Sequence, residues 1–271
     1  MSYGPRPWIQ QHWDWRAAAN FMLGGTGGGL VAAAALLEEP GAPLALGAGL
    51  ALVAAGLGAV WLEIGRKLRA LHVFFNPFTS WMTRESFAAV VLFALGLAAL
   101  ATGSRWLGAA AAAAALAFIF CQGRILYASK GIPAWRIREV VPLIVATGVG
   151  EGAALALVFG LQSGLAALAA LALAARALAW ARYRQALGAG AAARVLEPAG
   201  RALLQFGTVA PLAALVLALF WPAGAWLAAA LALATGWRLK FVLVARASYN
   251  QGFALPQVPV RGARTDRRTP A

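Results

Sequence analysis

The chain has 271 residues, of which 62% are hydrophobic and only 12% charged, and its mean hydropathy is +0.72. Soluble domains carry about twice this share of charged residues. The composition therefore excludes a soluble enzyme and a nucleic-acid-binding module, despite a formal net charge of +14. It predicts an integral membrane protein made of helices.

Eight apolar segments follow one another along the chain, each about 20 residues long, the length that crosses the hydrocarbon core of a bilayer. We place these predicted transmembrane helices at 15–37, 44–63, 87–104, 106–127, 140–160, 163–181, 202–221 and 223–245. Short turns join them in pairs, and the longer connections at 64–86, 128–139 and 182–201 are basic.

This spacing predicts an all-α fold of eight transmembrane helices in a single membrane domain, 1–271. We expect two four-helix bundles, at 15–127 and 140–245. The parts outside the bundles are an interfacial tail, a basic docking loop and a basic C-terminal tail, at 1–14, 128–139 and 246–271.

The basic residues predict the orientation. All 23 lysines and arginines except Arg105 fall in the tails, in the long connections or near the span ends on one side. Cytoplasmic loops of membrane proteins carry such an excess of positive charge. We therefore expect cytoplasmic termini and long loops, in a bacterial cytoplasmic membrane. Contact with anionic lipid explains the net charge best, and docking of an acidic partner is the alternative.

Cysteine and histidine are scarce. Cys121 is the single cysteine, and His12 and His72 lie outside the apolar segments. Iron–sulfur clusters need about four thiolates, and structural zinc sites need four ligands. We expect this chain to hold no haem, no iron–sulfur cluster and no metal.

A glycine-rich run, Gly-Gly-Thr-Gly-Gly-Gly at 24–29, lies in the middle of the first span. It could suggest a phosphate-binding loop, but no strand precedes it. Small residues let membrane helices approach closely, and we favour that interpretation.

Polar residues inside the spans are candidate functional residues, because they are unfavourable in a bilayer. Asn20, Glu63, Arg124 and Tyr127 fall on the cytoplasmic side of the first four spans and are expected to converge. Glu151 lies near mid-membrane. It is either part of a proton path or, as we favour, a packed carboxylic acid hydrogen-bonded to a neighbouring helix. Arg176 lies near the cytoplasmic end of the sixth span.

A carboxylate, an amide, a phenol and a guanidinium around an apolar cleft suit a quinone. Its carbonyl oxygens need hydrogen-bond donors, and its reduction moves two protons with two electrons. Glu63, near Arg124, could exchange those protons, with His72 or water as a relay. The alternative is that Glu63 and Arg124 form a simple interfacial ion pair.

The connection at 64–86 mixes aromatic and basic side chains, including Trp81 and Arg84. Such a segment is typical of an amphipathic stretch lying in the membrane interface. The functional alternative is a docking platform and lid over Glu63.

Two groups of residues in these loops resemble a known family. The first comprises Glu63-Ile64-Gly65, Arg69-Ala70, Ser80-Trp81 and Arg84-Glu85, and the second comprises Arg124, Tyr127, Ile132-Pro133-Ala134-Trp135 and Pro142. They resemble signatures of the membrane-anchor subunits of DMSO-reductase-type molybdoenzymes. Segments 13–21 and 250–262 resemble anchors of phenylacetyl-CoA:acceptor oxidoreductase.

The resemblance implies a three-part complex. A molybdopterin catalytic subunit and an iron–sulfur subunit would dock on the cytoplasmic face, and a quinone, menaquinone or ubiquinone, would bind in the anchor. In polysulfide-reductase-type anchors an asparagine, an acid and a tyrosine form the quinone pocket, and these match Asn20, Glu63 and Tyr127. DMSO-reductase anchors have histidine at the position of Glu63, so its role is inferred.

Together these considerations give two sets of candidate residues. The proton-exchanging residues are Glu63, Tyr127 and His72, and the quinone-binding residues are Asn20, Glu63, Arg124, Tyr127, Trp81 and Arg84. Two other functions remain open. A small secondary transporter would have mid-membrane polar groups in both halves, and a structural tether would bind no quinone.

Overall fold

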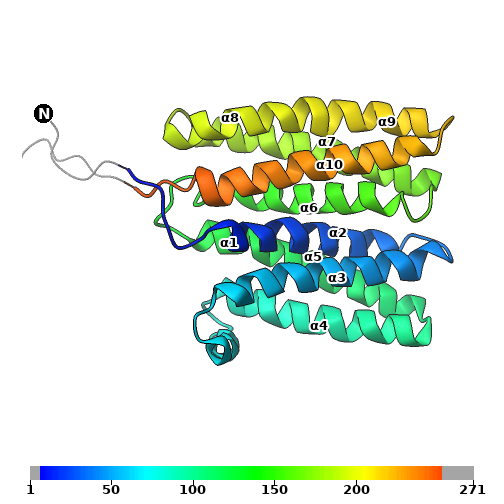
Figure 1. Ribbon diagram of the computed structural model, residues 1–271, viewed down its shortest axis with the longest axis horizontal. Helices are drawn as coiled ribbons and strands as arrows, with labels where there is room; N and C mark the ends of the chain where they lie inside the picture. The colour runs from blue at the N-terminus through cyan, green and yellow to red at the C-terminus, as the bar shows by residue number, and fades with distance from the viewer. Residues whose placement is uncertain (1–6, 252–271) are drawn as a thin grey trace, which may run out of the picture.

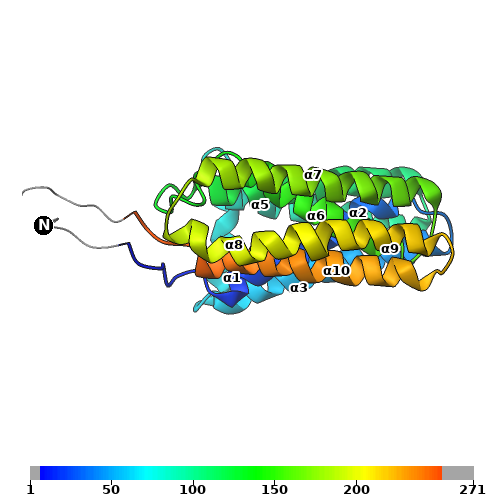
Figure 2. The ribbon, with the colours of Figure 1, turned by 90° about the horizontal axis from the view of Figure 1, so that it is seen from above.

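The structure is a computed structural model that describes residues 7–251. Its long helices run side by side along one axis (Figure 1, Figure 2), and within these residues the only extended pairing is a single bridge between Ile9 and Tyr249. The predicted all-α fold is confirmed. In chain order, the helical elements are α1 (Trp15–Ala19), η1 (Asn20–Gly24), α2 (Gly25–Ala34), α3 (Gly41–Glu63), η2 (Lys67–Phe75), α4 (Trp81–Thr102), α5 (Arg105–Ala128), α6 (Val140–Ala156), α7 (Ser163–Leu187), α8 (Ala191–Leu204), η3 (Gln205–Val209), α9 (Ala210–Ala218), α10 (Ala223–Phe241) and η4 (Val242–Arg246).

Six helical segments in the described range are long and apolar enough to cross a membrane, which indicates a multi-pass membrane protein. They are Gly41–Glu63, Trp81–Thr102, Arg105–Ala128, Ser163–Leu187, Ala191–Ala218 and Ala223–Arg246. The other two apolar segments are helical as well. One is the rod formed by α1, η1 and α2, in which η1 is a π-helical turn, and the other is the shorter α6.

The predicted connection at 182–201 is wrong. α7 continues to Leu187, and α8 begins at Ala191. Leu196 and Leu203 of α8 are buried, whereas Arg194 and Arg201 are exposed. The segment is thus an amphipathic helix, and its apolar face packs on the protein although its composition is basic.

The connection at 64–86 is shorter than predicted. α4 begins at Trp81, because the side chain of Ser80 accepts a hydrogen bond from the backbone N–H of Thr83 at 3.3 Å and caps the helix. Glu85 therefore lies inside the first turns of α4, where it is buried. Before α4, η2 forms a 3₁₀ helix without buried residues.

α2 lies at the centre of the molecule and contacts α3, α5 and α6. A Cβ added to Gly29 would overlap the carbonyl group of Gly148, and one added to Gly152 would overlap the backbone of Gly29. On the other side of α2, Gly27 packs against the backbone of Gly49. The glycine run therefore lets helices approach closely, as expected.

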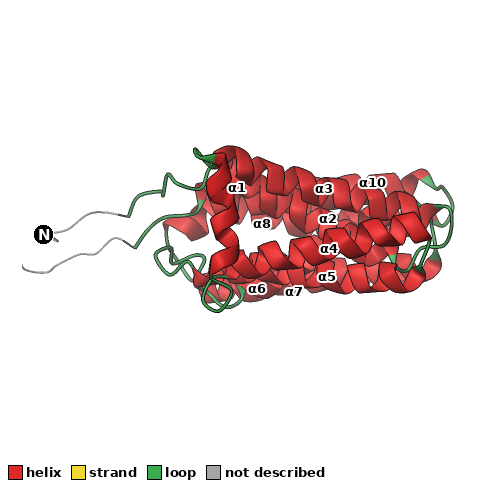
Figure 3. Ribbon diagram, turned by 90° about the horizontal axis from the view of Figure 1, so that it is seen from below, coloured by secondary structure: helices red, strands yellow, loops and turns green. Residues whose placement is uncertain are grey.

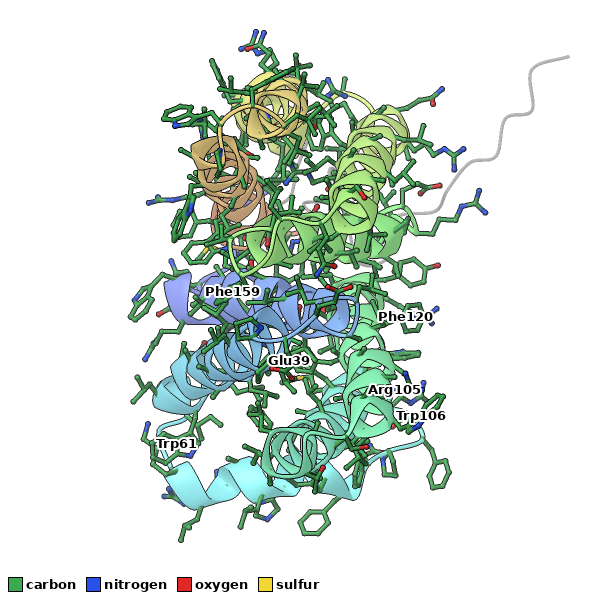
Figure 4. The ribbon with its side chains drawn as sticks, turned by 90° about the vertical axis from the view of Figure 1, so that its right-hand side faces the viewer. Glu39, Trp61, Arg105, Trp106, Phe120 and Phe159 are labelled. Atoms are coloured by element: carbon green, nitrogen blue, oxygen red, sulfur yellow. The ribbon has the colours of Figure 1, made fainter. Side chains whose placement is uncertain are left out.

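The two ends of the molecule differ. Figure 4 views the end that carries Glu39, Arg105 and Phe159, where the chain turns between helices. The longer connections and both ends of the described chain lie at the opposite end (Figure 1, Figure 3). Lys240 and Arg176 are at neither end. Both are fully buried, so these two basic residues do not contribute to the exposed positive charge that the orientation prediction counts.

The connection at 128–139 is anchored to the bundle. Trp135 is buried, donates to the carbonyl of Leu243 at 2.9 Å and stacks on Trp13 with ring centroids 4.9 Å apart. The hydroxyl of Tyr183 donates to the carbonyl of Ala134 at 2.9 Å. The exposed basic residues here are Lys130, Arg136 and Arg138.

The N-terminal tail is described from residue 7 and the C-terminal tail to residue 251, and the rest of both predicted tails lies outside the described residues. Asp14 caps α1 by accepting from the backbone N–H of Arg16 at 2.8 Å. The same Arg16 donates its guanidinium hydrogens to the carboxylate and holds the pKa of Asp14 below its usual value.

Candidate functional site

An apolar cleft lies between the rod that contains Asn20, α3, α4 and η2. Its first part has a volume of ≈ 300 Å³ and its second a volume of ≈ 450 Å³. Residues that line both parts, and so join them, are Asn20, Val60, Ile64, Met82 and Glu85. Trp13, Phe21 and Glu63 complete the first part, and Leu71, Val73 and Phe74 of η2 cover the second.

A buried polar pair forms one wall of the cleft. The amide nitrogen of Asn20 donates to Oε1 of Glu85 at 3.1 Å, and the two residues are only 6% and 7% exposed. Behind them, the fully buried Gln122 donates from Nε2 to the backbone carbonyl of Asn20 at 2.9 Å.

The π-helical turn η1 begins at Asn20 and ends at Gly24. A Cβ at Gly24 would lie 2.8 Å from Nε2 of Gln122 and 3.1 Å from Oδ1 of Asn20. The missing side chain of Gly24 therefore makes room for both amides, and Gln122 bonds α5 to η1 beside the cleft. π-Turns inside α-helices are frequent at functional sites.

Glu63 is the last residue of α3, is half-buried and lines the first part of the cleft. The alternative of a simple ion pair between Glu63 and Arg124 is not observed, since no ion pair among residues 7–251 joins them. The charges of Asp14 and Arg16, which have opposite signs, act on Glu63.

Arg124 instead belongs to a separate aromatic cluster on α4 and α5. Two guanidinium groups lie over the ring of Trp81. That of Arg84 is 4.2 Å from the ring centroid, and that of Arg124 is 4.4 Å from it. Tyr127 presents its ring to Arg124 at 5.4 Å. Trp81 also meets the edge of Phe120, which points away from α5 in Figure 4.

Arg84 has a structural role in this cluster. It donates to the carbonyl oxygens of Pro77 at 2.9 Å and Phe78 at 2.7 Å, and so fixes the loop before α4. None of the four cluster residues Trp81, Arg84, Arg124 and Tyr127 lines either part of the cleft. Asn20 is instead bonded by Glu85 of α4 and Gln122 of α5.

His72 is exposed on η2, and its ring packs edge-on against Phe75 with centroids 5.3 Å apart. It does not line the cleft, whereas its neighbours Leu71, Val73 and Phe74 do. Through these apolar side chains η2 covers the second part of the cleft, whereas Glu63 lines only the first. A docking platform and lid over Glu63 stays a prediction.

Sequence reasoning missed Glu85 and Gln122. The signal for Glu85 was the capping residue Ser80, which starts the helix early enough to include Glu85 in α4. Gln122 was visible as an amide inside an apolar span. Its partner, the backbone carbonyl of Asn20, belongs to a different helix and is not visible in the sequence.

A second polar cluster lies deeper, between α2, α6 and α10. Glu151 pairs with Lys240 through Oε2 and Nζ at 2.8 Å, and the same oxygen accepts from the hydroxyl of Thr26 at 2.5 Å. Trp237 donates to that hydroxyl at 2.9 Å. Gly236 leaves room for the Glu151 carboxylate, which a Cβ at this position would overlap.

Arg176 of α7 lies beside this cluster and donates to the carbonyl oxygens of Ala232, at 3.0 Å, and Gly207. Glu151 is thus packed and bonded to neighbouring helices, as favoured, but it is paired with a lysine that the sequence placed at the membrane surface. Lys240 was missed because it lies only six residues before the helix end at Arg246.

Comparison with known proteins adds no identification, since no protein-family model and no curated protein matches this chain. The chemistry must be inferred from the two clusters. The cleft combines an apolar wall, an amide donor and a buried carboxyl group, which suits a largely apolar molecule with polar oxygens at one end.

Proposed function

We propose that this chain is the quinone-reactive membrane-anchor subunit of an oxidoreductase complex of the DMSO-reductase type. The observation that carries the proposal is the buried Asn20–Glu85 pair in the wall of an apolar cleft. An isoprenoid quinone has an apolar tail and a head with two carbonyl oxygens, and the cleft offers matching surfaces. When bound, the quinone accepts or supplies two electrons together with two protons.

The chain's own residues would hold the head and exchange its protons. Asn20 positions Glu85 through its amide hydrogen bond at 3.1 Å. Glu85 holds a proton on its carboxyl group or accepts one from a bound hydroxyl, and Glu63 at the cleft mouth exchanges protons with solvent. Met82 and Phe21 exclude water from the inner part of the cleft.

The position of the cleft supports a partner on the same side. Asn20, Glu63 and Glu85 all lie within a few turns of the end that bears the long connections. An iron–sulfur subunit docked there, with a molybdopterin subunit behind it, would be near the quinone. The exposed basic residues at this end, including Lys130, Arg136 and Arg138, suit an acidic docking surface. The substrate that we propose for the catalytic subunit is phenylacetyl-CoA.

We further propose eight membrane crossings, with both termini on the cytoplasmic side of a bacterial inner membrane. α6 has 17 residues and the rod from Trp15 to Ala34 has one π-turn, so both are about 25–30 Å long at 1.5 Å per residue. That length matches the hydrocarbon core.

Thiol labelling of intact cells tests this topology. In a Cys121→Ser background, a membrane-impermeant maleimide is expected to label Ser104→Cys and not Lys130→Cys. Lys130→Cys should become labelled only after the cells are opened. Labelling of Lys130→Cys in intact cells would contradict the orientation.

Substitution of Glu85 tests the quinone site. Glu85→Gln keeps the size and the hydrogen bond to Asn20 but removes the exchangeable proton. We expect electron transfer between the native complex and a short-chain ubiquinone or menaquinone analogue to fall about 10²–10⁴-fold, with activity toward a soluble dye acceptor retained.

Tyr127→Phe is the matched control. The family resemblance implies that this variant abolishes quinone activity, whereas the structure places Tyr127 outside the cleft. We expect its quinone activity to stay within about two-fold of the parent, because its ring stays beside Arg124. Normal quinone activity of Glu85→Gln together with loss in Tyr127→Phe would refute the site proposed here.

A secondary transporter is the second candidate function. The buried charges of Glu151, Arg176 and Lys240, on α6, α7 and α10, favour it, because intramembrane charges mark ion pathways in many transporters. Transport by the purified chain in vesicles, without partner subunits, would support this alternative over the anchor.

A further inference from the structure

The buried cluster of Glu151, Lys240 and Arg176 contains one negative and two positive groups. All three side chains are 0% exposed. Glu151 lies eleven residues after the first residue of α6, which is about 16 Å along the helix axis. A buried ion pair is tolerated when its charges balance. When Glu151, Lys240 and Arg176 are all ionised, the cluster has one positive charge in surplus.

Lys240 is the group that can give up this surplus charge. An arginine keeps its proton in proteins, whereas a buried lysine can become a neutral amine. In the described part of the chain, the charged groups that act on Lys240 are Glu151 and Arg176. With Lys240 neutral, Glu151 and Arg176 balance each other.

Lys240 is also the member of the cluster that reaches toward the cleft. A Cβ at Gly25 would lie 2.7 Å from Nζ of Lys240 and 3.4 Å from Oε1 of Gln122. Both side chains therefore meet at the gap left by this glycine. Gln122 in turn bonds the backbone of Asn20, and Asn20 bonds Glu85.

Three buried oxygens along this series have no hydrogen-bond partner among the residues that the structure describes. They are Oδ1 of Asn20, Oε1 of Gln122 and Oε1 of Glu151. Buried polar atoms are rarely left unpaired. These oxygens lie at successive points between the cleft and Lys240. Each can accept a hydrogen bond from a bridging water, which can carry a proton.

We propose that Lys240 is a proton-loading group, which exchanges one proton with Glu85 by way of Asn20, Gln122 and the gap at Gly25. This inference rests on the proposed function of the cleft. During quinol oxidation, two electrons pass to the iron–sulfur partner and both O–H bonds of the quinol break. Glu85 takes one of the two protons, and the other leaves to solvent by way of Glu63. The O–H bond on Glu85 then breaks and an N–H bond forms on the Lys240 amine. Quinone reduction runs the same transfer in reverse.

A count of protons in the first turnover tests the proposal. The native complex is purified by an affinity tag on this chain and placed in lipid nanodiscs. It is then mixed with a short-chain quinol in a weak buffer that contains a pH-indicator dye. The parent is expected to release one proton fewer per quinol oxidised than Gln122→Leu, because the parent stores that proton on Lys240. Lys240→Met is expected to match Gln122→Leu.

Two further variants separate this role from a structural one. Gln122→Glu keeps a polar side chain between Asn20 and Lys240. Unlike Gln122→Leu, it is expected to retain the proton as the parent does. Gly25→Ala fills the gap beside Lys240 and is expected to abolish it. Thermal unfolding and quinone-analogue binding are measured for each variant, so that a folding defect is recognised.

Equal proton release by the parent and by both Gln122→Leu and Lys240→Met would overturn the proton-loading role while leaving the quinone site intact. A parent complex that does not react with any quinone would overturn the proposed function itself, and the proton-loading role with it. If the complex works only toward quinone reduction, the same difference of one proton is expected in proton uptake.

Discussion

Replacing Glu151 by leucine is expected to lower the free energy of unfolding by about 3–5 kcal/mol, because it leaves the buried ammonium group of Lys240 without its partner. Arg176 is beside it, so two positive charges would then share a dry interior. The lost hydrogen bond from Thr26, at 2.5 Å, adds to the effect. Thermal unfolding of the purified chain in detergent measures the change.

The double variant Glu151→Leu with Lys240→Met separates the pair from its surroundings. Removing both charges is expected to recover part of the loss, because an apolar pair of similar volume often replaces a buried ion pair at little net loss, whereas the buried Arg176 still lacks the compensating charge of Glu151. Glu39→Gln, at the exposed end shown in Figure 4, is the control, with a change within about 0.5 kcal/mol. A double variant as unstable as Glu151→Leu would show that the pair does not explain the loss.

Gly152→Ala is expected to destabilise the protein by at least about 1–3 kcal/mol, because its methyl group would overlap the backbone of Gly29. α2 and α6 would have to move apart along their whole contact, and α2 also supports Thr26 beside Glu151. The measurement is again thermal unfolding in detergent, supplemented by the yield of folded protein from membranes.

Gly47→Ala and Gly58→Ala, both in α3, are the matched controls. A Cβ at either position meets nothing within 4 Å. Because alanine is a better helix former than glycine, we expect these variants to be unchanged or more stable by up to about 1 kcal/mol. Equal effects at Gly152 and Gly58 would mean that close packing of α2 on α6 is not required.

The cleft shows why contacts between helices could not be predicted from the sequence. A helix can be predicted locally because about 20 apolar residues in a row have few alternatives in a bilayer. The rotation of each helix about its axis is set by packing with its neighbours, however. That rotation turned Glu85 toward Asn20 and left Arg124 beside Trp81, so the candidate residues near the ends of the first four helices were divided between two places.

Lys240 illustrates the same limit for charge. Counting basic residues near helix ends gives a consistent orientation, but the count treats every lysine as exposed. Only the fold shows that Glu151, which lies 89 residues earlier in the chain, has its carboxylate 2.8 Å from the amine of Lys240 and compensates its charge inside the protein.

The composition and the apolar segments by themselves determined an all-helical protein that is suited to a membrane, as well as the approximate place of each helix along the chain. Both follow from the length and hydropathy of local segments. Only the tertiary structure decided that Glu85 faces Asn20, that Arg124 faces Trp81, and that four of the acidic and basic residues in the described part of the chain are buried: Glu85, Glu151, Arg176 and Lys240. These depend on how the helices are rotated and how closely glycines let them approach, which no single segment specifies.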